Sequence, residues 1–255
     1  MWRVIRIAVL LFILATVAQT AWLARARTAE WKTSLRVVLY PISADATPAT
    51  TRYLSDLRKT AFDPIENFFE VERVHHGVPL TRPVDIFFAP PIASRPPAAP
   101  YTSGKVQVIL WSLRLRYWAW RHDTHKGPKP DVRIFVSYHD PAVSPRLPHS
   151  TGLQKGLIGV VHAFASADMD GPNNVVIAHE LLHTLGATDK YDLATNRPLY
   201  PDGYADPLAQ PRYPQTRAEI MAGRIPLSAT QAEAPTSMKR VIIGETTARE
   251  INWLR

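Results

Sequence analysis

The 255-residue sequence contains no cysteine. This absence excludes disulfide bonds and thiolate metal sites, so any bound metal ion must be held by histidine, aspartate, glutamate or tyrosine. It leaves both reducing and oxidising compartments open. Since 46% of the residues are hydrophobic, a chain of this length can bury a substantial core without covalent cross-links.

Acidic residues are also missing from the first 27 positions, which carry the four arginines Arg3, Arg6, Arg25 and Arg27. Removing these four from the 30 basic residues leaves 26, against 22 acidic residues, in the rest of the chain. Nucleic-acid binding requires a clustered cationic face rather than a small excess of positive charge. We therefore expect no nucleic-acid partner.

Between those arginines, an uncharged apolar stretch runs from Ile7 to Ala24. Its length suits a single helical crossing of a bilayer. Small residues at Ala24 and Ala26 would allow signal-peptide cleavage, but the basic residues that follow the long apolar run favour an uncleaved anchor. We expect residues 1–27 to be a membrane anchor or signal segment. Residues 28–255 would form one exported domain, periplasmic or extracellular, and secreted if the segment is cleaved.

Strand and helix patterns alternate along the remaining chain. Strands are expected at 35–42, 84–89, 133–138 and 156–166. Helices are expected at 50–71, at 103–121, at 174–186 and near the C-terminus. The first of them would be kinked at Pro64, and the third would have Asn173 or Asn174 as its N-cap. This order predicts an α/β or α+β fold with a mixed, twisted sheet. The last strand, 156–166, is expected at the sheet edge beside the 174–186 helix.

The helix expected at 103–121 carries apolar residues at helical spacing: Val106, Ile109, Leu110, Leu113, Tyr117 and Trp120. Its mixture of arginine and tryptophan also suits a membrane or nucleic-acid surface. An aromatic stripe at this spacing usually packs a core, however. We expect this face of the helix to be buried.

The segment VVIAHELLHTLGATDKYD, residues 175–192, carries the clearest chemical pattern. On a helix, His179 and His183 are one turn apart, so both imidazoles can bind one ion from the same face. Glu180 then lies beside the ion, where its carboxylate can accept a proton from a water molecule. The pattern predicts a zinc site with a general base.

A catalytic zinc ion commonly has three protein ligands and an open position, so one further ligand is needed. Gly186 can adopt a left-handed conformation, which would end the helix and return the chain toward the metal at Asp189. Asp192 and Tyr191 are alternatives on the same loop. Glu219 is the alternative for a gluzincin-type arrangement, in which a glutamate on a later helix completes the site.

The stretch HELLHTLGATD resembles the extended motif of the metzincin zinc metalloproteases. That motif has two helical histidines, a glutamate base, a glycine at the turn and a third ligand three residues later. The third ligand is histidine in most members and Asp189 here, as in a minority. The family also has a methionine in a tight turn under the zinc, which Met221 and Gly223 match. The resemblance implies a metzincin-like fold and a Zn²⁺ ion held by His179, His183 and Asp189.

We therefore expect a zinc-dependent endopeptidase, with Glu180 as general base, that acts on a protein or peptide substrate. An extended substrate would pair along strand 156–166. His162 lies on that strand, from which its side chain could reach the cleft, but we expect it to have a structural role. The phenols of Tyr200, Tyr204 and Tyr213 are of a type that can polarise a substrate carbonyl, but we expect each to serve in packing or as a loop anchor.

A different class of function remains open on the same residues. A zinc ion can stabilise a non-catalytic binding or assembly module at the membrane, with the cleft closed by the loop from Pro198 to Pro214. Zinc binding needs no glutamate beside the ligands, whereas hydrolysis does. Glu180 therefore separates the two hypotheses.

Overall fold

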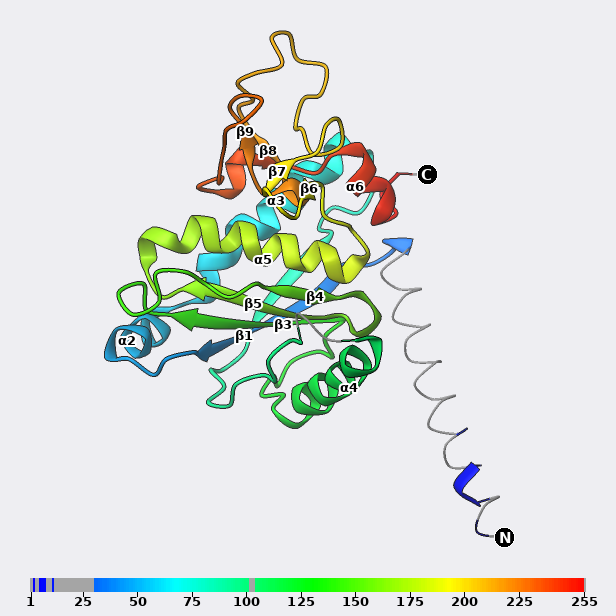
Figure 1. Cartoon of the computed structure of the whole chain (residues 1–255). Coiled ribbons are helices and arrows are strands. Elements are labelled where there is room, and N and C mark those ends of the chain that lie inside the picture. The colour runs from blue at the N-terminus through cyan, green and yellow to red at the C-terminus, as the bar shows by residue number, and fades with distance from the viewer. Residues whose placement is uncertain (1, 3–4, 8–10, 12–29, 101–103, 255) are drawn as a thin grey trace.

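A five-stranded sheet lies at the centre of the computed structural model, which describes residues 2, 5–7, 11, 30–100 and 104–254 (Figure 1). The strand order is β2–β1–β3–β5–β4. The parallel strands are β1 (Leu35–Ser43), β2 (Val84–Phe88), β3 (Val132–His139) and β5 (Ile158–Phe164), and β4 (Thr151–Leu153) is antiparallel at one edge. The predicted mixed α/β class is confirmed.

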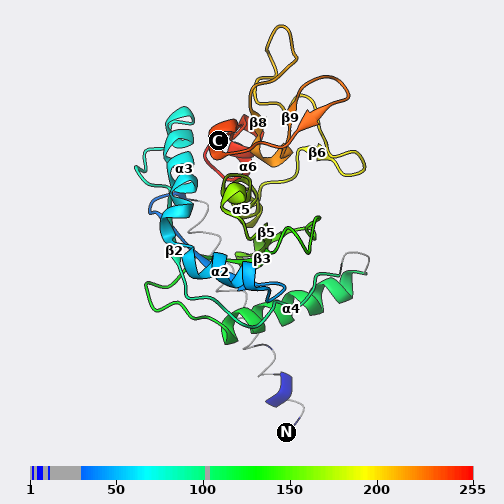
Figure 2. The same ribbon diagram turned by 90° about the vertical axis from the view of Figure 1, so that its left-hand side faces the viewer.

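Helices cover both faces of this sheet (Figures 1 and 2). The main helices are α2 (Pro48–Asp56), α3 (Asp63–His75), α4 (Lys105–Arg121), α5 (Asp170–Leu185) and α6 (Glu245–Glu250). Two-residue strands punctuate the C-terminal third: β6 (Tyr191–Asp192), β7 (Arg197–Pro198), β8 (Ala218–Glu219), β9 (Ile225–Pro226), β10 (Ala232–Glu233) and β11 (Val241–Ile242). Helices α3 and α5 lie on one side of the sheet, and α4 lies on the other.

Strand β1 is buried on both faces. Val37 and Leu39 contribute to the core beneath α5, whereas Val38 and Tyr40 contribute to the core beneath α4. None of the four is more than 1% exposed. A parallel strand covered on both sides reads as a continuous hydrophobic run, which explains why the sequence predicted this strand correctly.

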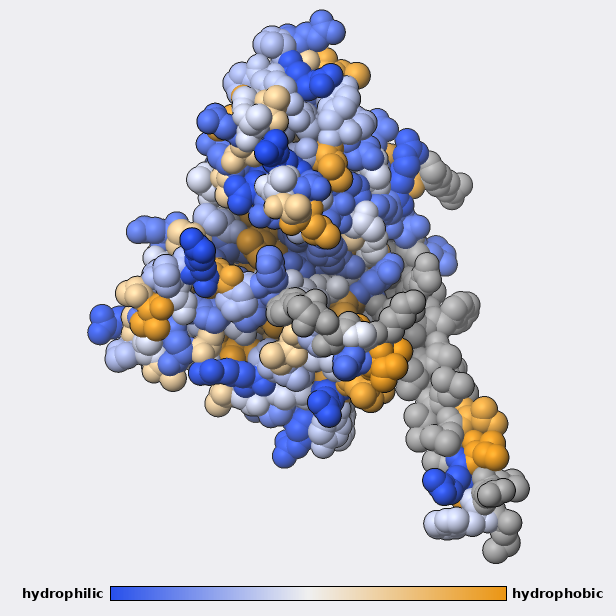
Figure 3. All heavy atoms as spheres, viewed as in Figure 1, coloured by the Kyte–Doolittle hydropathy of each residue, from blue (hydrophilic) through white to orange (hydrophobic). Residues whose placement is uncertain are grey.

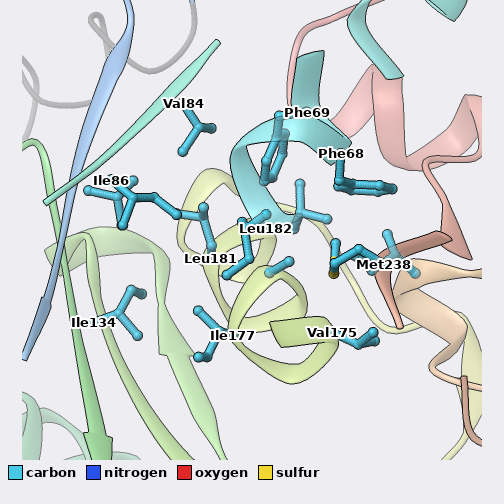
Figure 4. Packing of buried hydrophobic residues seen from close by; sticks show 14 of the residues in the cluster. Phe68, Phe69, Val84, Ile86, Ile134, Val175, Ile177, Leu181, Leu182 and Met238 are labelled. Atoms are coloured by element: carbon cyan, nitrogen blue, oxygen red, sulfur yellow. The ribbon is translucent and has the colours of Figure 1, made fainter. Parts of the chain in front are cut away.

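The hydrophobic side of α5 fills the space between the sheet and α3 (Figure 4). Ile177, Leu181 and Leu182 are at most 1% exposed and share one cluster with Phe69 of α3 and Ile134 of β3. Each Å² of apolar surface that these side chains remove from water stabilises the fold by about 25 cal/mol. This packing leaves the opposite side of α5 facing the C-terminal segments.

The predicted helix over residues 50–71 is two helices. α2 ends before Leu57, and a short 3₁₀ turn, Lys59–Phe62, precedes α3. Pro64 lies in the first turn of α3, where the missing N–H costs no helical hydrogen bond. The helix expected near the C-terminus corresponds to α6.

The predicted start of α5 at Asn173 or Asn174 was wrong, because the helix begins at Asp170. Asn173 exchanges two hydrogen bonds with the backbone of Phe164, accepting at 3.0 Å and donating at 2.9 Å. Asn174 donates to the carbonyl of Ala61 at 2.8 Å. These side-chain amides connect α5 to neighbouring segments. Because asparagine is also a common N-cap residue, the sequence does not distinguish the two roles.

The predicted edge position of strand 156–166 was also wrong. β5 is covered by β4, which pairs Thr151 with Val160 and Leu153 with Ile158. β4 has three residues and a central glycine, so it lacks the alternation that marks a strand. A Cβ at Gly152 would lie 2.6 Å from the Glu180 carbonyl oxygen, so glycine lets this strand approach α5 closely.

The expected burial of the apolar stripe on α4 is contradicted. Val106, Ile109, Leu113, Tyr117 and Trp120 are 55–72% exposed. The helix faces the sheet instead with a second apolar series, Trp111, Leu115 and Ala119, which is buried. Since α4 is apolar on more than one side, its periodicity alone could not decide which side packs.

Among the described residues, no helix combines the length and hydropathy needed to span a bilayer. The anchor expected over Ile7 to Ala24 lies almost entirely outside the described residues. The prediction for residues 1–27 is therefore based on the sequence alone.

We predict that Asn173→Ala lowers the free energy of unfolding by about 1–3 kcal/mol, because it leaves a partly buried N–H and carbonyl of Phe164 without the Asn173 amide. Urea unfolding measures this change. The matched control is Asn67→Ala at an exposed position of α3, which should change stability by less than about 0.5 kcal/mol. Equal effects of the two substitutions would contradict the tethering role.

Candidate metal centre

Three of the predicted residues meet beside α5. His179 and His183 lie one helical turn apart, with ring centroids separated by 4.6 Å. The Oδ1 atom of Asp189 is 3.3 Å from Nε2 of His179 and 3.1 Å from Nε2 of His183. The structure thus brings together the two histidines and the aspartate that the sequence predicted as ligands.

The turn after α5 makes this approach possible. Gly186 has φ 113° and ends the helix in the left-handed conformation, as predicted. Its N–H donates to the carbonyl of His183, and the N–H of Ala187 donates to that of Leu182 at 3.0 Å. The chain reverses at this point, so Asp189 returns to the helix face that carries the histidines.

Each imidazole is oriented by a backbone carbonyl. Nδ1 of His179 donates to the carbonyl of Ile220 at 2.9 Å, and Nδ1 of His183 donates to that of Ala187 at 2.8 Å. Since a carbonyl can only accept, each neutral ring carries its hydrogen on Nδ1 and directs a lone pair from Nε2 toward Asp189. Metal-binding histidines are commonly held in this way.

Three acceptor atoms therefore face one another without a donor between them. Oδ1 of Asp189 is buried and has no hydrogen-bond partner among the described residues. Two imidazole nitrogens and one carboxylate oxygen form a usual ligand set for a catalytic zinc ion. A cation in this space would satisfy all three acceptors, so the residues fit Zn²⁺.

The ionisation of the site also favours a positive charge. Burial would raise the pKa of Asp189, but the two imidazoles hold it well below its usual range. Burial would lower the pKa of His179, but Asp189, Glu180 and the Ile220 carbonyl raise it above its usual value. A proton or a metal ion is therefore stabilised in the same space.

Glu180 lies beside this group. One carboxylate oxygen of Glu180, one ring nitrogen of His179 and one ring nitrogen of His183 all lie within 4.8 Å of one another. Burial raises the pKa of Glu180, although the neighbouring histidines oppose the increase, and its Oε2 has no hydrogen-bond partner among the described residues. Asp189 is closer to both imidazoles, so Asp189 suits ligation and Glu180 suits proton transfer.

Glu219 shapes the turn that orients His179. Its carboxylate accepts hydrogen bonds from Thr247 Oγ1 at 2.7 Å, Gly244 N at 3.2 Å and Ala222 N at 3.0 Å. Burial raises the pKa of Glu219 against these hydrogen bonds. The carboxylate is engaged in holding the turn that presents the Ile220 carbonyl, which gives it a structural role rather than that of a ligand.

Met221 occupies the middle of this turn, and Gly223 closes it at φ 66°. Met221 is fully buried, and its carbonyl accepts the N–H of Lys190 at 3.0 Å. The turn also packs against α5. Met221 therefore lies between the motif helix and the loop that carries Asp189.

A partly buried ion pair holds that loop on both sides of Asp189. Nζ of Lys190 is 2.8 Å from both carboxylate oxygens of Glu250, and Thr188 donates to the same carboxylate from its N–H and its hydroxyl at 3.0 and 2.6 Å. Partial burial would raise the pKa of Glu250, but Lys190 and Thr188 lower it. This role could not be predicted from the sequence, because Glu250 lies on α6, 60 residues away from Lys190.

The alternative ligands on the loop have different environments. Asp192 is exposed and accepts from the N–H and hydroxyl of Thr195 at 2.9 and 2.7 Å in a turn. Tyr191 is half-buried, and burial together with the nearby Asp189 and Glu180 raises its pKa. Tyr191 therefore lies beside the candidate centre, whereas Asp192 is used in the turn.

The three tyrosines considered as substrate-polarising groups form a separate cluster. The hydroxyls of Tyr204 and Tyr213 are 2.8 Å apart, and the guanidinium of Arg212 lies 3.9 Å from the ring centre of Tyr200. Tyr200 and Tyr213 line a pocket of about 390 Å³. Among the described residues that line it, none is a member of the candidate metal centre.

His162 lies on the α4 side of the sheet, away from α5. It shares a cavity of about 260 Å³ with Val160 and Trp111, and its Nδ1 is 2.9 Å from Nε2 of His139. Burial lowers the pKa of His162 to about 4, and the His139 ring adds to the decrease. This pair supports the structural role expected for His162.

Comparison with known proteins adds no family to this description. No protein-family model matches the chain, and no curated protein matches it.

We predict that Glu250→Gln lowers zinc affinity by about 10–100-fold, because it weakens the contacts that hold the loop of Asp189. Competition with a fluorescent zinc chelator measures the affinity. Glu245→Gln is the matched control, since Glu245 is exposed on the same helix and pairs with Arg249 at 3.3 Å. Equal zinc affinities for the two variants would exclude a positioning role for Glu250.

Proposed function

We propose that the chain is a zinc-dependent endopeptidase of metzincin type. The observation that carries the proposal is the convergence of Nε2 of His179, Nε2 of His183 and Oδ1 of Asp189. The two Nδ1–H groups are already engaged with backbone carbonyls, so the three facing atoms are all acceptors. The HELLHTLGATD motif and the buried turn at Met221 agree with the same family.

His179, His183 and Asp189 would hold the Zn²⁺ ion. When bound, zinc supplies Lewis acidity, which polarises a scissile carbonyl and lowers the pKa of a water molecule. The remaining requirement for hydrolysis is a group that moves protons between this water molecule and the leaving amine.

Glu180 is suited to that task. Its carboxylate is buried next to the histidines, and one oxygen has no hydrogen-bond partner among the described residues. Burial raises its pKa, which brings the carboxylate closer to the proton affinity that an efficient general base needs at neutral pH. Glu180 would take a proton from the attacking water and pass it to the departing amine nitrogen.

The substrate would lie along β4 rather than along β5. β4 ends the sheet, and its backbone passes directly over Glu180 and His183 at Gly152. Figure 3 shows a hollow along α5, between the sheet and the C-terminal segments. An extended peptide that pairs with the outer edge of β4 would bring its backbone into this hollow.

The non-catalytic zinc module is the alternative function. It explains the three ligands equally well, but it gives no reason for a buried carboxylate with an unsatisfied oxygen at Glu180, which is costly for folding. The gluzincin alternative would require Glu219 to leave three hydrogen bonds. Both observations favour the metzincin-type peptidase.

The apolar segment Ile7 to Ala24 completes the proposal for location. We place the peptidase domain on the exported side of a membrane, held by that segment or released after its cleavage. The substrate class is a protein or peptide, since the β4 edge recognises main-chain groups.

We predict that Asp189→Ala and Glu180→Gln separate zinc binding from catalysis. Asp189→Ala removes an inner ligand, so zinc affinity should fall by orders of magnitude. Glu180→Gln keeps the ligands and nearly the same volume, so zinc content should stay stoichiometric while peptide hydrolysis falls by about 10²-fold to 10⁴-fold. Bound zinc and cleavage of a peptide library are measured on each purified protein.

Asp192→Ala serves as the control for the loop, and it should keep both zinc and turnover. Full zinc retention in Asp189→Ala would transfer the third-ligand role to another residue. Undiminished turnover in Glu180→Gln would overturn the hydrolytic mechanism, and stoichiometric zinc without any cleavage by the parent protein would favour the non-catalytic module.

A further inference from the structure

Helix α4 presents a continuous apolar face to solvent. Its exposed members are Val106 (69%), Ile109 (59%), Leu110 (50%), Leu113 (55%), Tyr117 (65%) and Trp120 (72%). They follow one another at intervals of one to four residues along 17 residues of helix. Figure 3 shows hydrophobic surface gathered over this part of the molecule. A contiguous apolar patch on a folded domain marks an interaction site.

The opposite side of α4 is anchored to the sheet. Trp111, Leu115 and Ala119 are at most 8% exposed and pack in the core with Tyr40 and Phe135. Nε1 of Trp111 also donates to the carbonyl of Pro97 at 2.9 Å. The helix is therefore held in place with its second apolar face directed outward, so binding to this face requires no folding of the helix.

The charge of α4 indicates what this face binds. The helix sequence KVQVILWSLRLRYWAWR contains one lysine and three arginines and has no acidic residue. Arg114 and Arg121 are exposed beside the apolar face. Basic side chains next to a face of leucine, isoleucine and tryptophan are typical of a helix that lies in the interface of an anionic membrane.

The aromatic residues and the rest of the chain agree with this partner. Tyr117 and Trp120, whose rings are 5.9 Å apart, lie at the C-terminal end of the apolar face. Tyrosine and tryptophan favour the boundary between lipid and water. Independently, the segment Ile7 to Ala24 has the composition of a bilayer-crossing helix, which would keep the domain close to lipid headgroups.

We propose that α4 is an interfacial membrane helix, whose face from Val106 to Trp120 inserts among the lipids of an anionic bilayer. Arg114 and Arg121 would contact the phosphate groups of the lipids. This contact is separate from the segment Ile7 to Ala24, and it fixes the orientation of the domain on the membrane. It is also independent of the proposed peptidase activity.

The absence of cysteine allows a direct test. A single cysteine is introduced by Leu113→Cys on the apolar face of α4, or by Leu208→Cys in the segment between β7 and β8. Leu208 is a matched control, since it is 85% exposed and its segment lies beyond α5, away from α4 (Figures 1 and 2). Each full-length variant is spin-labelled and reconstituted into vesicles of phosphatidylglycerol and phosphatidylcholine.

The measurement is the ratio of collisions with oxygen, which concentrates in lipid, to collisions with a neutral water-soluble nickel chelate. We expect this ratio to be several-fold higher at position 113 than at position 208. It should fall toward the aqueous value when Arg114→Glu and Arg121→Glu are added, or when the vesicles contain phosphatidylcholine alone. Circular dichroism of each variant checks that the helices are retained.

Two results would overturn the proposal. One is an aqueous ratio at position 113 equal to that at position 208 in anionic vesicles. The other is low access of both reagents together with spin–spin broadening between labels at position 113, which would show that a second copy of the chain covers α4. Neither result depends on zinc or on turnover, so the peptidase proposal is tested separately.

Discussion

Two backbone carbonyls set the directions of the histidine rings, and the candidate centre depends on where those carbonyls lie. Ala187 belongs to the reversal after Gly186, so its position follows from the end of α5 itself. Ile220 belongs to a turn 41 residues after His179. That turn is fixed by Glu219, which receives hydrogen bonds from it and from the segment leading into α6. The centre therefore forms only when the C-terminal third has folded over the helix.

The buried carboxylates show how the fold separates support from chemistry. Glu66 accepts the N–H of Ile86 at 2.7 Å, and Glu72 accepts that of Ile243 at 2.7 Å. Each connects α3 to another segment, so the cost of burying its charge is offset by a backbone hydrogen bond. Glu180 and Asp189 differ, because each has a buried oxygen without a partner among the described residues. The two unsatisfied carboxylate atoms lie where a cation and a reacting water would bind.

The features that depend on local geometry alone are those that could be predicted from the sequence. The relation between His179 and His183 depends on a single helical turn, and the reversal at Gly186 depends on one backbone conformation, so both could be predicted. The buried parallel strands were predictable because burial on both faces leaves a hydrophobic run. These features need no knowledge of what lies elsewhere in the chain.

The features that could not be predicted depend on distant partners. β4 is defined by its pairing with β5, because its sequence has too few residues to show alternation. Glu250 is an ordinary surface acid by sequence, and only the packing of α6 beside Lys190 makes it part of the site. On α4 two apolar stripes compete, and the choice of Leu115 over Leu113 for the core is made by the sheet.

The positions of α4 and α5 relate the two proposals to each other. The helices lie on opposite faces of one sheet, so a bilayer that contacts α4 is separated from the histidines by the full thickness of that sheet (Figures 1 and 2). Packed layers of this kind are about 10 Å apart. The outer edge of β4 would then remain in water beside the membrane. A peptidase held in this orientation would act on extended segments in the aqueous phase near the bilayer, because a segment inside the hydrocarbon keeps its backbone hydrogen bonds within a helix and offers no strand to pair with β4.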